Sequence, residues 1–347
     1  MNNHIERGLE LPENREKEGP RQVFLITRHV ERTPAGDLTP DGLAVASKKG
    51  EAIEAEVLKG YSSTEPTDRA YKTLEQMSQS SGITSARLEQ SDREEKHYKT
   101  RRREGLAYNI TGPLEARIKA KSQMIDAAVK RDYSDYDPKD KSQGEKWAPI
   151  RAKYQPIGLR EALVDEQIRH IFAMGLAAQF ESNTEISNEY VKKRQSALER
   201  KEVDAKPIEK DVILNTGTHG GFTEALMSKA LVRKGSDNKE KRGFDISRDE
   251  KGDVQFEKAM GDIILPGESI KTGYPVGEET PDMLPVEFEQ GRFQGEECYL
   301  DTQKIKLLAE QFKIYQDKLK KWQKEKTKEN EDELVATVDQ LEKEFGV

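Results

Sequence analysis

Two short apolar runs, far apart in the chain, constrain its fold more than any other feature. They cover residues 22–27 (QVFLIT) and 211–215 (DVILN). Both are too short for a helix and rich in β-branched residues, so each predicts a buried strand. Each run ends in a segment that contains a histidine, and a helical pattern follows. This order predicts two strand–loop–helix units of one α/β sheet.

The first helical pattern has a clear start. Thr39 is a good N-cap and Pro40 suits the first helical position. Small or apolar residues then recur at a spacing of three to four, which predicts one buried helical face. These residues are Leu43, Ala46, Gly50, Ile53 and Val57.

Apolar spacing predicts further elements along the rest of the chain. Helices are expected from Asp68 to Met77 and over residues 113–129, 159–180 and 222–230, and a strand is expected at 261–266. The tail from Asp301 to Phe345 reads as one or two amphipathic helices that pack on the core or on a partner.

Composition limits the remaining classes of protein. The chain has 347 residues, with 58 Lys and Arg against 65 Asp and Glu, for a formal net charge of −7. A net acidic chain is a poor candidate for binding nucleic acid through phosphate contacts. No window approaches the ~18 consecutive apolar residues of a membrane span, and residues 1–20 show no secretory signal. The single cysteine, Cys298, fits a reducing compartment. We therefore expect a cytoplasmic protein with neither a membrane nor a nucleic-acid partner.

Two of the five histidines stand where an α/β sheet carries its chemistry. His29 follows Arg28 at the end of the first run, and His219 follows Thr218 at the end of the second. Reactive groups in such sheets lie beyond the carboxyl ends of the strands. Imidazole is a good nucleophile, and arginine binds phosphate oxygens with paired hydrogen bonds. Gly220 lets backbone N–H groups approach an anion. Together these residues indicate phosphoryl chemistry.

Three segments in chain order resemble the histidine phosphatase superfamily, the phosphoglycerate mutase-like fold. Residues 25–32 (LITRHVER) with 38–42 (LTPDG) are similar to its Arg-His-Gly opening and the Leu-Thr-x-x-Gly that follows. Residues 68–73 (DRAYKT) are similar to its second segment, an Arg-Ala pair with a Thr that opens a helix. Residues 218–221 (THGG) resemble its C-terminal histidine segment.

The resemblance implies a role for each matched residue. His29 would attack phosphorus and become transiently phosphorylated. Arg28, Arg69 and His219, with Thr218 and Gly220 beside them, would bind the phosphoryl oxygens. Arg32 matches an additional pocket arginine of the acid-phosphatase branch. Enzymes of this family need no metal or other cofactor, and none is expected here.

The sequence departs from the family in two places and leaves the proton donor open. Val30 stands where the family has glycine, and His219 is followed by glycine, as in the mutase-like branch, rather than by the aspartate of the acid phosphatases. The leaving alcohol needs a carboxylic acid, for which Glu89, Glu95 and Glu104 compete. Residues 95–98 (EKHY) resemble a segment of phosphoglycerate mutases, whereas Glu104 follows a predicted strand end. We favour Glu104.

The predicted architecture is a three-layer α/β/α core of this type with an inserted helical cap and a helical C-terminal extension. Its parts are a flexible tail (1–20), the core (21–112 and 207–300), the cap (113–206) and the extension (301–347). The predicted activity is metal-independent hydrolysis of a small phosphomonoester through phospho-His29. A mutase-type phosphoryl transfer and an inactive scaffold of the same fold are the alternatives. Association with a second copy or a protein partner is expected through the C-terminal helices.

Overall fold

The computed structural model describes most of the chain. It covers residues 19–31, 37–55, 57–62, 69–83, 123, 125–140, 146–147, 150–151, 154, 160–203, 205–218, 221–236, 239–250, 254–258, 260, 264, 266–290, 292–293 and 295–345. The structural statements below concern these residues.

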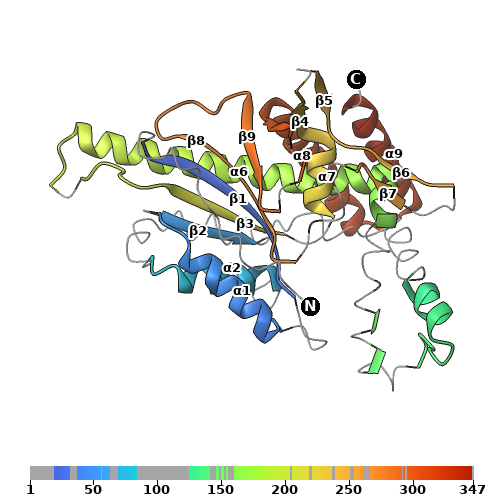
Figure 1. Cartoon of the computed structure of the whole chain (residues 1–347). Helices are drawn as coiled ribbons and strands as arrows, with labels where there is room; N and C mark the ends of the chain where they lie inside the picture. The colour runs from blue at the N-terminus through green and yellow to red at the C-terminus, as the bar shows by residue number, and fades with distance from the viewer. Residues whose placement is uncertain are drawn as a thin grey trace.

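In this part of the chain, eight strands form one mixed sheet in the order β2-β3-β1-β8-β9-β10-β4-β5 (Figure 1). Only β1, β2 and β3 run parallel to one another, and the other pairs are antiparallel. A separate two-stranded ribbon joins β6 and β7. The strands are β1 (Arg21–Arg28), β2 (Val57–Ser62), β3 (Val212–Thr218), β4 (Leu231–Lys234), β5 (Glu240–Arg242), β6 (Ile246–Arg248), β7 (Val254–Phe256), β8 (Ser269–Pro275), β9 (Met283–Phe288) and β10 (Glu297–Asp301).

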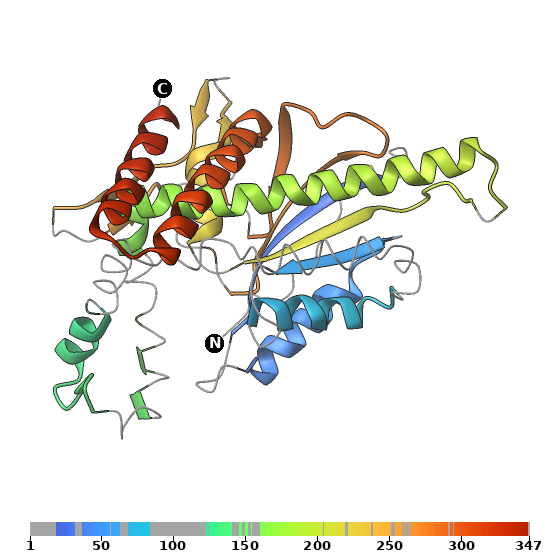
Figure 2. The same ribbon diagram turned by 180° about the vertical axis from the view of Figure 1, so that it is seen from behind.

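Helices cover both faces of the parallel strands. Successive side chains of a strand point to opposite faces, and β1 is apolar on both. Val23 and Leu25 pack beneath α1 (Pro40–Glu51) and α2 (Arg69–Ser80). Phe24 and Ile26 pack against α6 (Glu166–Glu199), which runs along the other face (Figure 2). A strand buried on both sides reads as a continuous apolar run, which is why the sequence reveals β1 and β3.

The C-terminal helices pack on α6 rather than extending away from the core. They are α8 (Thr302–Lys324) and α9 (Lys328–Phe345), and with α7 (Phe222–Ala230) they complete this layer (Figure 2). The prediction of amphipathic helices packed on the core is confirmed. Four apolar residues of α8 are buried, whereas a fifth, Ile314, is 48% exposed. The buried four are Ile305, Leu308, Phe312 and Leu319.

The predicted helix after the first strand is confirmed as α1, although one residue of its predicted buried face is exposed. The Thr39 side chain caps it by accepting a hydrogen bond from the Gly42 N–H at 3.0 Å. Ala46, Gly50 and Ile53 are buried as predicted, but Leu43 is 39% exposed because Gly42 takes the inward position. Val57 belongs to β2 instead of the helix.

Two further boundaries differ from expectation. The prediction of a strand at 261–266 is wrong, because Ile264 has no regular secondary structure. The next strand, β8, begins at Ser269. The long helix predicted over 159–180 runs instead from Glu166 to Glu199, and its polar second half packs on the sheet through Asn183, which binds Thr216, and Ser187, which binds Gln22. Asp165 caps its start by accepting from the N–H groups of Gln167 and Ile168. The helix expected at 222–230 is confirmed as α7, and that from 68 to 77 as α2.

The prediction of a mixed α/β protein is confirmed. Within the region predicted as a cap, residues 166–199 pack on the sheet as α6, whereas Ile125, Val129, Tyr136 and Trp147 form a small apolar cluster of their own. The division into core and cap stays a prediction. No helix in the described ranges has both the length and the apolar character that crossing a bilayer requires.

Candidate functional site

The carboxyl ends of β1 and β3 form the centre of the candidate site. The two strands are parallel neighbours, and their register pairs Arg28 with Thr218. Just beyond them, the backbone N–H of His29 donates to the carbonyl oxygen of Thr218 at 3.0 Å. The first and third of the three segments therefore lie side by side, although nearly two hundred residues separate them in the chain.

The second segment reaches the same edge through α2. The buried hydroxyl of Thr73 accepts a hydrogen bond from the N–H of Val30 at 3.2 Å. The helix also lies directly on the end of β3, because a Cβ added to Gly217 would lie 3.0 Å from the carbonyl oxygen of Ala70. Gly217 thus permits the close approach, and Arg69 begins the helix at this point. The Arg69 side chain lies outside the described part of the structure.

Hydrogen bonding selects the tautomer of His29. This side chain is buried, with 5% of its surface exposed, and Nδ1 lies 2.8 Å from the carbonyl oxygen of Val30. A carbonyl can only accept, so Nδ1 carries the proton. In the neutral ring the lone pair is then on Nε2. That is the arrangement a nucleophilic imidazole requires.

Val30, the residue that departs from the family pattern, points into the core. It is 2% exposed and packs in the apolar cluster beneath α1 and α2. Two glycines make room for it: a Cβ on Gly42 would lie 3.0 Å from one Val30 methyl, and a Cβ on Gly267 would lie 3.4 Å from the other. The larger side chain is therefore accommodated by the layer below the sheet edge.

Arg28 is held through both its backbone and its side chain. Its N–H donates to the carbonyl of Glu268 at 3.0 Å, and its carbonyl accepts from the Gly267 N–H at 3.0 Å. Gly267 has φ +83°, a conformation that favours glycine. The Arg28 guanidinium donates to the carbonyl of Ile264. Backbone groups of the segment that precedes β8 thus hold both the main chain and the guanidinium of Arg28.

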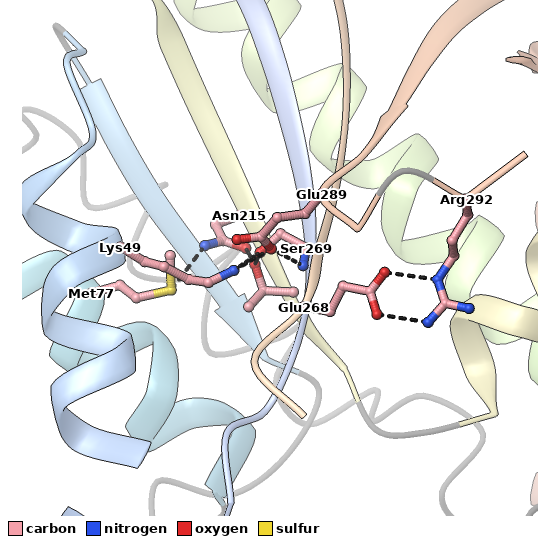
Figure 3. Close-up of polar contacts among 8 residues, drawn as sticks. Lys49, Met77, Asn215, Glu268, Ser269, Glu289 and Arg292 are labelled. Carbon is pink, nitrogen blue, oxygen red and sulfur yellow. Dashed lines mark hydrogen bonds and ion pairs between the residues drawn. The ribbon is translucent and has the colours of Figure 1, made fainter. Parts of the chain in front are cut away.

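Sequence reasoning missed two buried glutamates: Glu268, whose backbone carbonyl accepts the Arg28 N–H, and Glu224, whose carboxylate binds the N–H of Ile264. Glu268 is fully buried and forms a two-pronged ion pair with Arg292, with both N–O distances 2.8 Å (Figure 3). Glu224 is also fully buried, in the first turn of α7. The one sequence signal was that Glu224 stands at the third helical position after Gly221, where a glutamate commonly caps a helix. Nothing in the sequence marks the pairing of Glu268 with Arg292.

A polar network lies on the other side of the same strands (Figure 3). The hydroxyl of Thr27 donates to the side-chain oxygen of Asn215 at 2.8 Å and lies 3.0 Å from the Ser269 hydroxyl. Lys49 of α1 donates to Ser269 at 3.1 Å and forms an ion pair with Glu289 at 2.5 Å. These buried contacts tie β1, β3 and β8 to α1 one residue before Arg28.

The remaining predicted site residues cannot be placed. Arg32, His219 and Gly220 lie outside the described residues, as do the three candidate proton donors Glu89, Glu95 and Glu104. The structure thus brings together Arg28, His29, Thr218 and the start of α2. The roles of the other positions stay predictions.

A scan against protein-family models finds no match for this chain. A search of curated protein sequences likewise finds no similar protein.

Proposed function

We propose that this chain is a metal-independent phosphomonoester hydrolase of phosphoglycerate mutase-like fold that works through a phosphohistidine on His29. One observation carries the proposal: three sequence segments with the histidine phosphatase pattern meet at one sheet edge. Arg28 and Thr218 are register partners, and Thr73 binds the backbone next to His29. The carboxyl ends of neighbouring parallel strands meet in any sheet of this kind, so the support comes from the motif residues that meet at this edge.

The local chemistry supports the same conclusion. With its Nδ1 proton donated to a carbonyl, His29 has its lone pair on Nε2, the atom that would form the bond to phosphorus. Arg28 precedes His29 in the chain, Arg69 starts the helix that lies against the end of β3, and by resemblance both guanidinium groups would bind the phosphoryl oxygens. Positive charge at this point stabilises the oxygens of the transferring phosphoryl group.

The proposed reaction has two steps. His29 Nε2 attacks phosphorus, the bond to the leaving oxygen breaks, and a carboxylic acid protonates the leaving alkoxide. Water then attacks the phosphohistidine, giving its proton to the same carboxylate, and inorganic phosphate leaves with His29 restored. Glu104, favoured over Glu89 and Glu95 because it follows a predicted strand end, would be this acid, and by resemblance His219 would bind the phosphoryl oxygens.

Hydrolysis of an aryl phosphate in the presence of a metal chelator tests the proposal. The wild-type chain is expected to be active, and His29→Ala is expected to lose activity by at least ~10³-fold, since a covalent nucleophile has no substitute. His4→Ala, which alters a histidine of the tail predicted at residues 1–20, is the matched control and should retain activity. Activity in His29→Ala would overturn the mechanism.

Rapid quench with phosphate-labelled substrate tests the intermediate itself. Wild-type protein should trap acid-labile, alkali-stable label, as expected for a phosphorus–nitrogen bond, and His29→Ala should trap none. Adding a second phosphoryl acceptor distinguishes a mutase from a hydrolase, because a mutase would return the label to the acceptor rather than to water. A burst of product without protein-bound label would contradict the covalent route.

A further inference from the structure

Glu224 has an unusual position for a negative charge. It is 0% exposed, and both of its carboxylate oxygens bind backbone amides: Oε2 accepts from Gly221 N–H at 2.9 Å, and Oε1 accepts from Ile264 N–H at 2.8 Å. Burying a carboxylate is costly unless charge-assisted hydrogen bonds compensate. These two bonds, at the positive end of α7, account for its presence there.

The two amides belong to segments that matter for the site. Gly221 is the last residue of the third segment, directly after His219 and Gly220. Ile264 accepts a hydrogen bond from the Arg28 guanidinium through its carbonyl. One carboxylate therefore joins the end of the third segment to the residue that binds the arginine of the first.

Only an anion of this length fits both bonds. A glutamine at this position has one accepting oxygen, and its NH₂ group would face the N–H of the second amide. An aspartate keeps the charge but is shorter by one methylene, so it cannot reach both amides without a backbone shift. The geometry thus requires Glu224 specifically.

We propose that Glu224 is a positioning residue: its carboxylate fixes the backbone at Gly221 and Ile264 and so sets where Arg28 presents its guanidinium to a phosphate group. The inference rests on the proposed function where it is tested by enzyme kinetics. Its test by phosphate binding does not require the chain to turn over a substrate.

Three variants of the full chain test this proposal. Glu224→Gln and Glu224→Asp each break one of the two bonds in a different way. Glu257→Gln is the matched control, since Glu257 likewise accepts from a backbone amide, that of Asp245, but it pairs with Arg233 and belongs to the β4–β7 side of the molecule. If Glu224→Gln fails to fold, Glu224→Asp still carries the test.

Amide hydrogen exchange and binding of inorganic phosphate are the primary measurements. Both Glu224 variants should accelerate exchange in the peptides that contain Gly221 and Ile264. They should weaken phosphate binding, measured by calorimetry, by about tenfold, as expected when a hydrogen bond to a charged group is lost. The control should change neither quantity.

Kinetics separate positioning from a general loss of folded protein. Misplacement of Arg28 raises the KM for an aryl phosphate in parallel with the phosphate Kd, whereas partial unfolding lowers kcat and leaves KM unchanged. Faster exchange with unchanged phosphate affinity would overturn the proposal, as would unchanged exchange or a wild-type chain that binds no phosphate. If phosphate binding weakens as expected but the wild type hydrolyses nothing, the proposed function fails and the positioning role stands.

Discussion

The two halves of the sheet are built from different kinds of contact. The parallel half, β2-β3-β1, is held by apolar layers on both faces, with α1 and α2 on one side and α6 on the other. The antiparallel half, from β8 to β5, shares the apolar core of α6 through Ile270, Leu284 and Leu300 and adds a cluster of buried charge. In its core, Arg233 is paired with Glu257 and Glu296 and is 2% exposed as a residue.

The difference explains where the candidate site lies. Parallel strands deliver their carboxyl ends to one edge, so Arg28 and Thr218 become neighbours there. The antiparallel strands supply supports instead: the Glu268–Arg292 pair lies at the start of β8, and Glu268 also accepts the Arg28 N–H. Apolar packing thus creates the edge, and buried ion pairs hold the segments that border it.

The largest expected effect comes from breaking the charge cluster of the antiparallel half. Arg233→Ala should lower the free energy of unfolding by about 3–5 kcal/mol, because it removes the buried cation that pairs with Glu257 and Glu296 and leaves Glu296 only the exposed Lys241. Urea denaturation followed by circular dichroism measures it. Lys321→Ala, which removes an exposed ion pair with Glu333, is the control and should cost at most about 1 kcal/mol. Equal losses in the two variants would contradict the comparison.

A steric change tests the apolar half. A Cβ at Gly50 would lie 2.2 Å from the carbonyl oxygen of Met77, where α1 crosses α2. Gly50→Ala should therefore force the helices apart and cost about 2–3 kcal/mol, beyond the gain in helix propensity. Gly19→Ala, whose Cβ would contact nothing within 4 Å, should be neutral under the same denaturation assay. A stable Gly50→Ala protein would show that this crossing is not tightly packed.

The pH dependence of the unfolding free energy tests the helical layer that contains α6, in which His170 is buried. Burial, with a smaller contribution from the positive charge of Lys229, lowers the pKa of His170 to about 3. Its pKa in the unfolded chain is near 6.5. Between these values the unfolded state binds the proton and the folded state does not, so stability is complete above pH 6.5 and falls as the pH drops. The loss should reach about 2 kcal/mol at pH 5.

Comparison of wild type with His170→Gln, by urea denaturation between pH 7 and pH 5, isolates this contribution. Glutamine does not titrate, and its amide can still donate to Gln311, which lies 3.1 Å from His170 Nε2. The unfolding free energy of the variant should fall less steeply with decreasing pH than that of the wild type. Identical slopes would show that another group causes the acid sensitivity.

The smallest expected effect is at the cap of α1. Thr39→Ala removes the acceptor for the Gly42 N–H and should cost about 1 kcal/mol. Thr39→Ser keeps the hydroxyl and should recover most of the loss, which thermal unfolding would measure. A loss in both variants would indicate that the threonine methyl matters more than the cap.

Sequence reasoning succeeded where local pattern and tertiary environment agree. β1 and β3 are buried on both faces, so their apolar runs are continuous and visible. It failed for β8 and β9 because Gly273 and Pro285 ordinarily argue against strands. Gly273 is in fact required, since a Cβ there would lie 2.4 Å from the carbonyl oxygen of Gln22 in β1.

The sequence by itself determined the two strand–loop–helix units, the Thr39 cap and the three motif segments, because each depends on residues within one short stretch. Only the tertiary structure decided that Arg28 and Thr218 pair, that Thr73 binds the backbone of Val30, and that Glu224 and Glu268 are buried against Ile264 and Arg292. Those contacts join residues distant in the chain. Their partners are chosen by strand register and helix packing, which no local pattern encodes.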